Sequence, residues 1–147
     1  MRKNWLFYEE LYKKREIDPN CDQWLEQLPS IDIEQKIKLD KDFTMNEVSN
    51  VVLKSMHQGK SPGNDGLTLG IYVLAWKYIK KFVLKSFKES MRIGELSAPQ
   101  KQSVIRLIEK RDKDTSYIKN WRPISLLNVD TKILAKLLAD RLKTVLA

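Results

Sequence analysis

Hydrophobic residues recur at helical spacing in several stretches of the chain, and this pattern predicts the main elements of its fold. The first such group lies between Trp5 and Tyr12 and predicts a short helix, which ends before the turn residues Asp18-Pro19-Asn20. The pattern is weaker between Cys21 and Phe43. There it indicates a second short helix around Trp24 and, after it, an irregular linker.

The helix expected from residue 44 onward has a well-defined beginning. Thr44 and Glu47 form the Ser/Thr-x-x-Glu capping box, in which each side chain bonds to a backbone N–H of the other residue. We expect this helix to stop at Gly59, which places His57 in its last turn. Contact with the negative helix end, or simple exposure, is favoured for this imidazole over a catalytic role.

The longest predicted helix covers residues 69–93 and is closed by Gly94. Its apolar residues recur at helical spacing and are Tyr72, Ala75, Trp76, Ile79, Phe82, Val83 and Phe87. Such a stripe favours a place in the hydrophobic core over a platform for stacked bases. A last amphipathic helix begins near Asn128, a good N-cap residue. Because the chain stops at Ala147 within this pattern, we expect a domain truncated at its C-terminus.

Two runs rich in β-branched and apolar residues predict short strands at residues 103–109 and 121–126. The polar connection between them, residues 111–119, makes the pair an antiparallel hairpin with a long loop. Pro123 indicates an edge position or an early strand end, because proline cannot donate to a strand ladder. The predicted fold class is α+β, mainly helical with one small antiparallel hairpin.

Composition constrains the number of domains, the kind of binding partner and the cellular compartment. The chain has 147 residues, 42% of them hydrophobic and 31% charged, which suits one compact core. The net charge of +8 mildly favours a polyanionic partner, although such a surface also serves solubility. The single cysteine, Cys21, excludes an internal disulfide, and one histidine leaves too few ligands for a structural zinc. No apolar run could span a membrane and no secretory signal is recognised, so we expect an intracellular protein of the cytoplasm, the nucleus or both.

Cations converge at the predicted hairpin. Arg106, Ile108 and Lys110 share a face by the period of two, and Arg122 stands across the loop from Lys110. A lysine as a point charge and an arginine as a planar fork suit a triphosphate or a nucleic-acid backbone. The alternative, equally supported by the pattern alone, is that these cations are solvated and protect an edge strand.

The segment KSPGNDGL, from Lys60 to Leu67, is rich in residues that leave the backbone bare. Gly63 and Gly66 allow close approach or a positive φ, and Asp65 can bond to its own turn. Bare amides beside Lys60 could hold phosphate, but the pattern alone favours a plain loop between two helices. It is not a P-loop, since no Gly-Lys-Ser/Thr opens the following helix.

The carboxylates offer no metal site and no catalytic group. Two-metal phosphoryl transfer needs clustered acids that hold ions ~3.5–4 Å apart. Asp40 and Asp42 fall in the weak linker, whereas Asp112 and Asp114 lie among basic residues, where charge balance is the simpler account. Asp130 is solitary and complements the dipole of the last helix.

Three segments together resemble the start of the reverse transcriptase domain of non-LTR (LINE-type) retrotransposons. They are KSPGNDGL, RLIEKRDKD and WRPISLLNVDTKILAKLLADRLK, in this order and spacing. The resemblance covers residues 44–147, and residues 1–43 are similar to the linker that these proteins place before the polymerase. It implies the fingers portion of an incomplete right-hand polymerase fold, without most of the palm and without the thumb.

The resemblance also implies roles for single residues. Lys110 and Arg122 would face the triphosphate of the incoming nucleotide. The loop residues Lys60, Ser61, Gly63, Asp65 and Gly66, with Arg106, would contact nucleic acid. Two positions depart from the family: Glu109 replaces a usual proline and puts a negative charge next to Lys110, and Asn64 also takes a position often held by proline.

The family's catalytic aspartates would lie beyond Ala147, so the resemblance implies neither a catalytic residue nor a cofactor in this segment. Mg²⁺, an RNA template, a DNA primer and a deoxynucleoside triphosphate are implied for the full-length enzyme, and the oligomeric state is left open. A non-catalytic nucleic-acid-binding module, domesticated or decayed, is the alternative function. A relic without a retained role is the third hypothesis.

Overall fold

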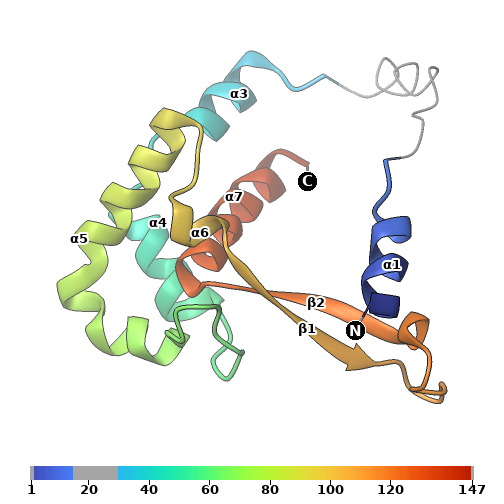
Figure 1. Cartoon of the computed structure of the whole chain (residues 1–147). Helices are drawn as coiled ribbons and strands as arrows, with labels where there is room; N and C mark the ends of the chain where they lie inside the picture. The colour runs from blue at the N-terminus through green and yellow to red at the C-terminus, as the bar shows by residue number, and fades with distance from the viewer. Residues whose placement is uncertain (1, 15–29, 147) are drawn as a thin grey trace. The chain divides into compact units, whose positions relative to one another are not determined.

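The computed structural model describes residues 2–14 and 30–146 (Figure 1). The helices and strands are α1 (Arg2–Leu11), α3 (Ile33–Asp40), α4 (Met45–Asn50), the π-helix η1 (Val51–Ser55), α5 (Leu69–Ile93), α6 (Ala98–Lys101), β1 (Ser103–Glu109), the 3-10 helix η2 (Ile118–Asn120), β2 (Trp121–Leu127) and α7 (Val129–Leu146). Helices thus make up most of the described chain, and β1 and β2 pair as a two-stranded sheet. The short helix expected around Trp24 lies outside the described residues.

The chain divides into two compact units. One comprises Met1–Ile31 and Leu107–Ile124, so α1 and the tip of the hairpin belong to it, whereas the other comprises Asp32–Arg106 and Ser125–Ala147. The domain boundary expected between residues 43 and 44 rests on family resemblance and stays a prediction, as does the assignment to a polymerase fingers fold. Within the described residues no helix is both long and apolar enough to cross a membrane.

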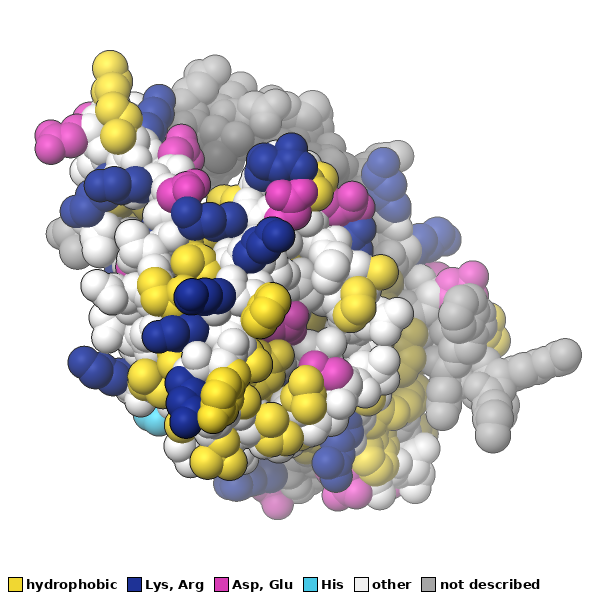
Figure 2. Space-filling model, turned by 90° about the vertical axis from the view of Figure 1, so that its left-hand side faces the viewer, with side chains coloured by type: hydrophobic (Ala, Val, Ile, Leu, Met, Phe, Trp, Pro, Cys, Tyr) yellow, Lys and Arg dark blue, Asp and Glu magenta, His cyan; other side chains and the backbone are white. Residues whose placement is uncertain are grey.

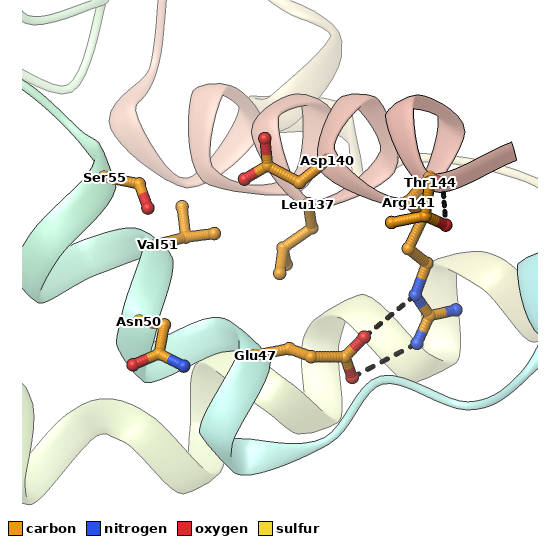
Figure 3. A pocket seen from close by; sticks show the side chains of 8 residues that line it. All are labelled: Glu47, Asn50, Val51, Ser55, Leu137, Asp140, Arg141 and Thr144. Atoms are coloured by element: carbon orange, nitrogen blue, oxygen red, sulfur yellow. Dashed lines mark hydrogen bonds and ion pairs between the residues drawn. The ribbon is translucent and has the colours of Figure 1, made fainter. Parts of the chain in front are cut away.

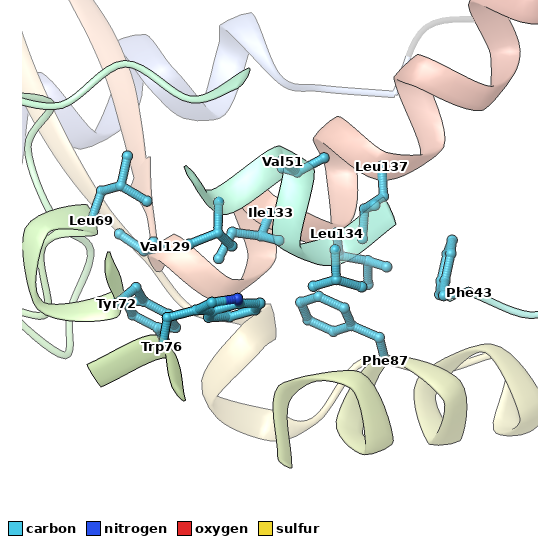
Figure 4. Packing of buried hydrophobic residues seen from close by; sticks show 12 residues of the cluster. Phe43, Val51, Leu69, Tyr72, Trp76, Phe87, Val129, Ile133, Leu134 and Leu137 are labelled. Atoms are coloured by element: carbon cyan, nitrogen blue, oxygen red, sulfur yellow. The ribbon is translucent and has the colours of Figure 1, made fainter. Parts of the chain in front are cut away.

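The hydrophobic core lies in the larger unit, where α4, η1, α5 and α7 pack against one another (Figure 4). Its buried side chains are Phe43, Val48, Val51, Val52, Leu69, Tyr72, Trp76, Phe87, Val129, Ile133, Leu134 and Leu137. Trp76 also donates its indole N–H to the Ser49 hydroxyl at 3.1 Å, so this ring is anchored at its polar end. The aromatic residues of α5 were expected to lie in the core. This is confirmed for Tyr72, Trp76 and Phe87 and is wrong for Phe82, which is exposed.

The irregular linker expected before residue 42 is wrong, because the structure has the helix α3 there. Asp32 caps it: the Asp32 carboxylate accepts the N–H of Gln35 at 2.7 Å, and the Gln35 side chain accepts the N–H of Asp32 at 3.1 Å. None of its side chains is buried. Its isoleucines, Ile33 and Ile37, are exposed and too few to form an apolar stripe like those of the other helices, so the capping box was the stronger signal.

The helix that follows begins as predicted and ends early. The Thr44 hydroxyl accepts the N–H of Glu47 at 3.2 Å, and the Glu47 carboxylate accepts the N–H of Thr44 at 2.7 Å. After α4 the turns widen into η1, whose last bond runs from the N–H of Met56 to the Val51 carbonyl. The expected end at Gly59 is therefore wrong, and His57 lies beyond the helix as an exposed residue.

The prediction for α5 is confirmed at both of its ends. Gly94 adopts φ of +75°, the left-handed conformation of a C-terminal cap, and its N–H donates to the Ser90 carbonyl at 2.9 Å. The two strands are also confirmed, with β2 one residue longer than expected.

Candidate functional site

The pairing at the tip of the hairpin fixes which side chains share a face. The N–H of Lys110 donates to the Asn120 carbonyl at 2.8 Å. In an antiparallel pair this bond places Lys110 opposite Asn120, and therefore Ile108 opposite Arg122. Opposite residues point to the same face, and so do residues two apart on one strand. Lys110 and Arg122 are thus diagonal neighbours on one face of the tip.

The amine of Lys110 is held in place. The Lys110 side chain is half-buried, and its Nζ donates to the Lys119 carbonyl at 2.7 Å, across the loop. An ammonium has three donors, so two of them remain for another acceptor. Arg122 is exposed, and among the described residues it forms no ion pair. The tip therefore presents one positioned cation beside one exposed guanidinium.

Glu109 belongs to the opposite face of the tip. Successive side chains of a strand alternate between the two faces, so the Glu109 carboxylate points away from the face of Lys110 and Arg122. The ion pairs of the described residues do not include Glu109 either. Its proximity to Lys110 in the sequence therefore does not put a negative charge on the cationic face.

Asp114 organises the loop that carries these groups. Its carboxylate accepts the N–H of Ser116 at 2.9 Å, and its carbonyl accepts the Asn120 side-chain amide at 2.7 Å. The hydrogen bond from the Ser116 backbone lowers the pKa of Asp114. The Trp121 indole N–H bonds to the Thr115 carbonyl at 2.9 Å, and α1 packs against η2 on the same unit. Asp114 thus forms a turn where charge balance was expected.

The loop from Lys60 to Leu67 depends on its glycines for the two reasons anticipated. A Cβ on Gly63 would lie 2.2 Å from Asn128 Oδ1 and 2.4 Å from Asn128 N, so no side chain fits there. Gly66 has φ of +70°, the left-handed conformation that glycine adopts without steric cost. The Asp65 carboxylate accepts the N–H of Leu67 at 3.0 Å, as expected for a self-bonded turn.

Asn128 and Lys132 fasten this loop to the start of α7. The Asn128 side chain accepts the N–H of Asp65 at 3.4 Å and donates to the Pro99 carbonyl at 3.1 Å. Lys132 Nζ donates to the Ser61 carbonyl at 2.8 Å. Asn128 does precede α7, as predicted, but its side chain joins the loop to α6 instead of capping the helix. Tertiary contacts therefore occupy the side chain that was expected to cap α7.

Most of the tight turn's amides are already used. The N–H groups of Asp65, Gly66 and Leu67 donate to Asn128, the Gly63 carbonyl and Asp65 respectively. Backbone amides that could hold phosphate are therefore expected only at the beginning of the loop. There the Lys60 side chain is exposed, and no ion pair of the described residues includes it.

A buried polar network surrounds Gln100 on α6, a helix that the sequence pattern did not predict. Gln100 is buried, and its side-chain amide donates to the Asp130 carboxylate at 2.9 Å. The Thr131 hydroxyl donates to the Gln100 carbonyl at 3.2 Å. Burial, followed by the nearby charges of Asp130 and Asp65, raises the pKa of Tyr72 to about 12. Asp130 lies in the first turn of α7, as expected, and accepts the bond from Gln100. Within the described residues, no group of three or more His, Cys, Asp or Glu could hold a metal.

Arg141 has a structural role that no local pattern of residues predicts. It borders a groove of about 260 Å³ lined by Glu47, Asn50, Val51, Ser55, Leu137, Asp140, Arg141 and Thr144 (Figure 3). Its guanidinium forks onto the Glu47 carboxylate at 3.0 and 3.2 Å and also donates to the carbonyls of Leu39, Lys41 and Asp42. These partners lie about a hundred positions earlier in the chain. With its donors occupied, Arg141 ties the end of α3 and the start of α4 to α7.

Comparison with known proteins gives one informative similarity. No family model matches the chain. Over 142 residues, 96% of the chain, it is 37% identical to the Transposon TX1 uncharacterized 149 kDa protein of Xenopus laevis. The chain spans 11% of the length of that relative. This similarity supports a retrotransposon origin for the chain. Because it covers 142 of the 147 residues, it includes most of residues 1–43 as well as most of the region that carries the family resemblance.

Proposed function

We propose that the chain is part of an RNA-directed DNA polymerase of a LINE-type retrotransposon and binds the triphosphate of the incoming nucleotide. The observation that carries this proposal is the shared face of Lys110 and Arg122 at the hairpin tip. The Lys110 amine, held by the Lys119 carbonyl, supplies a point charge, and the Arg122 fork supplies paired donors for phosphate oxygens.

We propose that the loop from Lys60 to Gly66 contacts the nucleic-acid template, whereas the hairpin tip binds the triphosphate. The bonds to Asn128 and Lys132 hold the loop in one conformation, as a preorganised binding surface requires. Lys60 and the exposed Arg106 would meet the phosphates of the nucleic acid backbone.

Catalysis is assigned by this proposal to the remainder of a longer protein. Phosphoryl transfer needs clustered carboxylates that hold Mg²⁺, and the chain spans 11% of its TX1 relative. In this proposal the chain binds and orients phosphates. The RNA template, the DNA primer and the metal all bind to the full-length polymerase.

Binding of a deoxynucleoside triphosphate to the 147-residue chain, followed by NMR titration, tests the proposed triphosphate site. Lys110→Ala and Arg122→Ala should each weaken binding on the order of ten-fold, the value of one charge-assisted hydrogen bond at an exposed site. Arg111→Ala is the matched control, because it removes an equal charge one residue away. Glu109→Gln should leave the affinity nearly unchanged, since its carboxylate points to the other face.

The alternative, a non-catalytic nucleic-acid-binding module, is favoured by the exposed cations of Lys60, Arg106 and Arg122. It predicts that the tip variants weaken RNA binding while a deoxynucleoside triphosphate neither binds nor competes with RNA. If Arg111→Ala weakened triphosphate binding as much as Lys110→Ala, the specific pairing of Lys110 with Arg122 would be refuted.

A further inference from the structure

The outer face of α5 exposes apolar side chains together with lysines. Ile71, Leu74, Tyr78 and Phe82 are 45%, 84%, 69% and 75% exposed, and their spacing of three and four residues places them on one stripe of the helix. Lys77, Lys81 and Lys85 share this side of α5. We call these seven residues the α5 outer face. Figure 2 shows lysine and arginine side chains beside hydrophobic ones on this side of the molecule.

None of the three lysines forms an ion pair within the described residues. The carboxylates near the end of α5 are already paired: Glu89 with Arg92 at 2.6 Å, and Asp42 with Lys88 at 2.7 Å. Lys77, Lys81 and Lys85 appear in no ion pair of the described chain. The face is therefore positively charged along two turns of helix.

The two aromatic rings stand out among the exposed apolar groups. Tyr78 and Phe82 are four residues apart, so they project about 6 Å from each other along the axis. The Lys77 amine lies 4.7 Å from the centroid of the Tyr78 ring, within the range of a cation–π contact. Rings that stack on bases and lysines that meet the backbone are the two components of single-strand binding surfaces.

We propose that the α5 outer face binds single-stranded nucleic acid, with bases stacked on Tyr78 and Phe82 and phosphates bound by Lys77, Lys81 and Lys85. Charge complementarity selects a polyanion and disfavours a second copy of this face, because the same lysines would then oppose one another. The inference shares its ligand class with the proposed function but adds a surface that neither the hairpin tip nor the loop from Lys60 to Gly66 includes.

Fluorescence anisotropy with a labelled 12-nucleotide oligouridine and with a blunt duplex of equal length tests the surface on the intact chain. Tyr78→Ala and Phe82→Ala should each weaken single-strand binding roughly 5- to 150-fold, the range found for one stacked base. Neither change should alter duplex binding, because paired bases are not available to stack. Tyr12→Ala, which removes an exposed ring from another part of the chain, is the control.

The combined change of Lys77, Lys81 and Lys85 to alanine should reduce the slope of log affinity against log salt by about 2, at about 0.7 per phosphate contact on single strands. The combined change of Lys36, Lys38 and Lys41 to alanine removes the same charge from an exposed part of the same unit and should change the slope much less. Because all of these side chains are exposed or lie on the surface, thermal unfolding should stay within a few degrees of the parent chain.

Two results would overturn the inference. Unchanged single-strand affinity in Tyr78→Ala and Phe82→Ala would exclude stacking and favour an acidic, apolar protein segment as the partner of this face. Equal losses on the single strand and the duplex would likewise exclude it. Since Lys110→Ala and Arg122→Ala do not touch α5, failure of the triphosphate test leaves this test intact, and the reverse also holds.

Discussion

Replacing Gly63 with alanine tests how tightly the loop from Lys60 to Leu67 is bound to the start of α7. The added Cβ would lie 2.2 Å from Asn128 Oδ1, 2.4 Å from Asn128 N and 2.5 Å from the carbonyl carbon of Leu127. Two of these three atoms are backbone, so a side-chain rotation at Asn128 cannot relieve the contact. Either the loop or the junction between β2 and α7 must move.

The expected cost follows from the two parts of this displacement. Overpacking a well-packed site costs about 1–3 kcal/mol. Moving the loop also weakens the bonds from Asp65 to Asn128 and from Lys132 to Ser61, each worth about 1 kcal/mol. We expect Gly63→Ala to lower the free energy of unfolding by about 2–3 kcal/mol, which corresponds to about 6–12 °C in Tm for a chain of this size.

Thermal and urea unfolding followed by circular dichroism measure this loss, with Gly66→Ala as the matched control. Gly66 has φ of +70° but no atom within 4 Å of a built Cβ, so alanine there costs only the backbone strain of about 1 kcal/mol. Asn128→Ala added to Gly63→Ala should not restore stability, because the backbone contacts remain. Equal losses for the two glycine variants, or full rescue by Asn128→Ala, would refute the steric argument.

Two further predictions concern the ion pair of Arg141 and Glu47. Arg141→Lys should destabilise the chain by about 2 kcal/mol in urea unfolding, because one ammonium cannot replace a guanidinium that bonds a carboxylate and three carbonyls; an unchanged midpoint would contradict this role. Burial raises the pKa of Glu47, but hydrogen bonds from Arg141 and Thr44 outweigh it and hold that pKa below the ordinary 4.5. A carboxyl whose pKa is lowered by folding stabilises the fold above its unfolded pKa, so this contribution should be lost as pH falls below about 4.5. Unfolding free energies of Glu47→Gln should lack that part of the acid sensitivity of the parent chain, and identical pH profiles would rule it out.

The parts of the fold that were predictable are those encoded by neighbouring residues. The capping box of Thr44 and the closing glycine of α5 are local signals, and both were found where the sequence placed them. The helix α3 was missed because it is short, and Ile33 and Ile37 are too few to form a periodic apolar stripe. Periodicity finds longer helices that have such a stripe, but it does not separate a buried stripe from an exposed one such as the α5 outer face.

The parts that were not predictable depend on residues far apart in the chain. Asn128 was expected to cap α7, yet its side chain bonds to Asp65, 63 positions earlier. The role of Arg141 has no local signature for the same reason. Phe82 has the spacing of a core residue but falls on the outer side of α5, since spacing alone does not say which neighbouring elements cover a helix. For the candidate site, the sequence named Lys110 and Arg122, and the register of the hairpin was needed to show that these two side chains share a face.

The two-stranded sheet has a consequence for how the isolated chain behaves when concentrated. Among residues 2–14 and 30–146, each strand of this sheet has one edge without a partner strand. The register that pairs Ile108 with Arg122 puts Pro123 at a non-hydrogen-bonded position, where its ring nitrogen faces outward and offers no donor on the β2 edge. β1 contains no proline, and all seven of its side chains, several of them β-branched, are exposed. Intermolecular pairing that leads to aggregates should therefore begin at β1, and a lysine in place of Ile105 is the change that would suppress it while leaving the cationic face untouched.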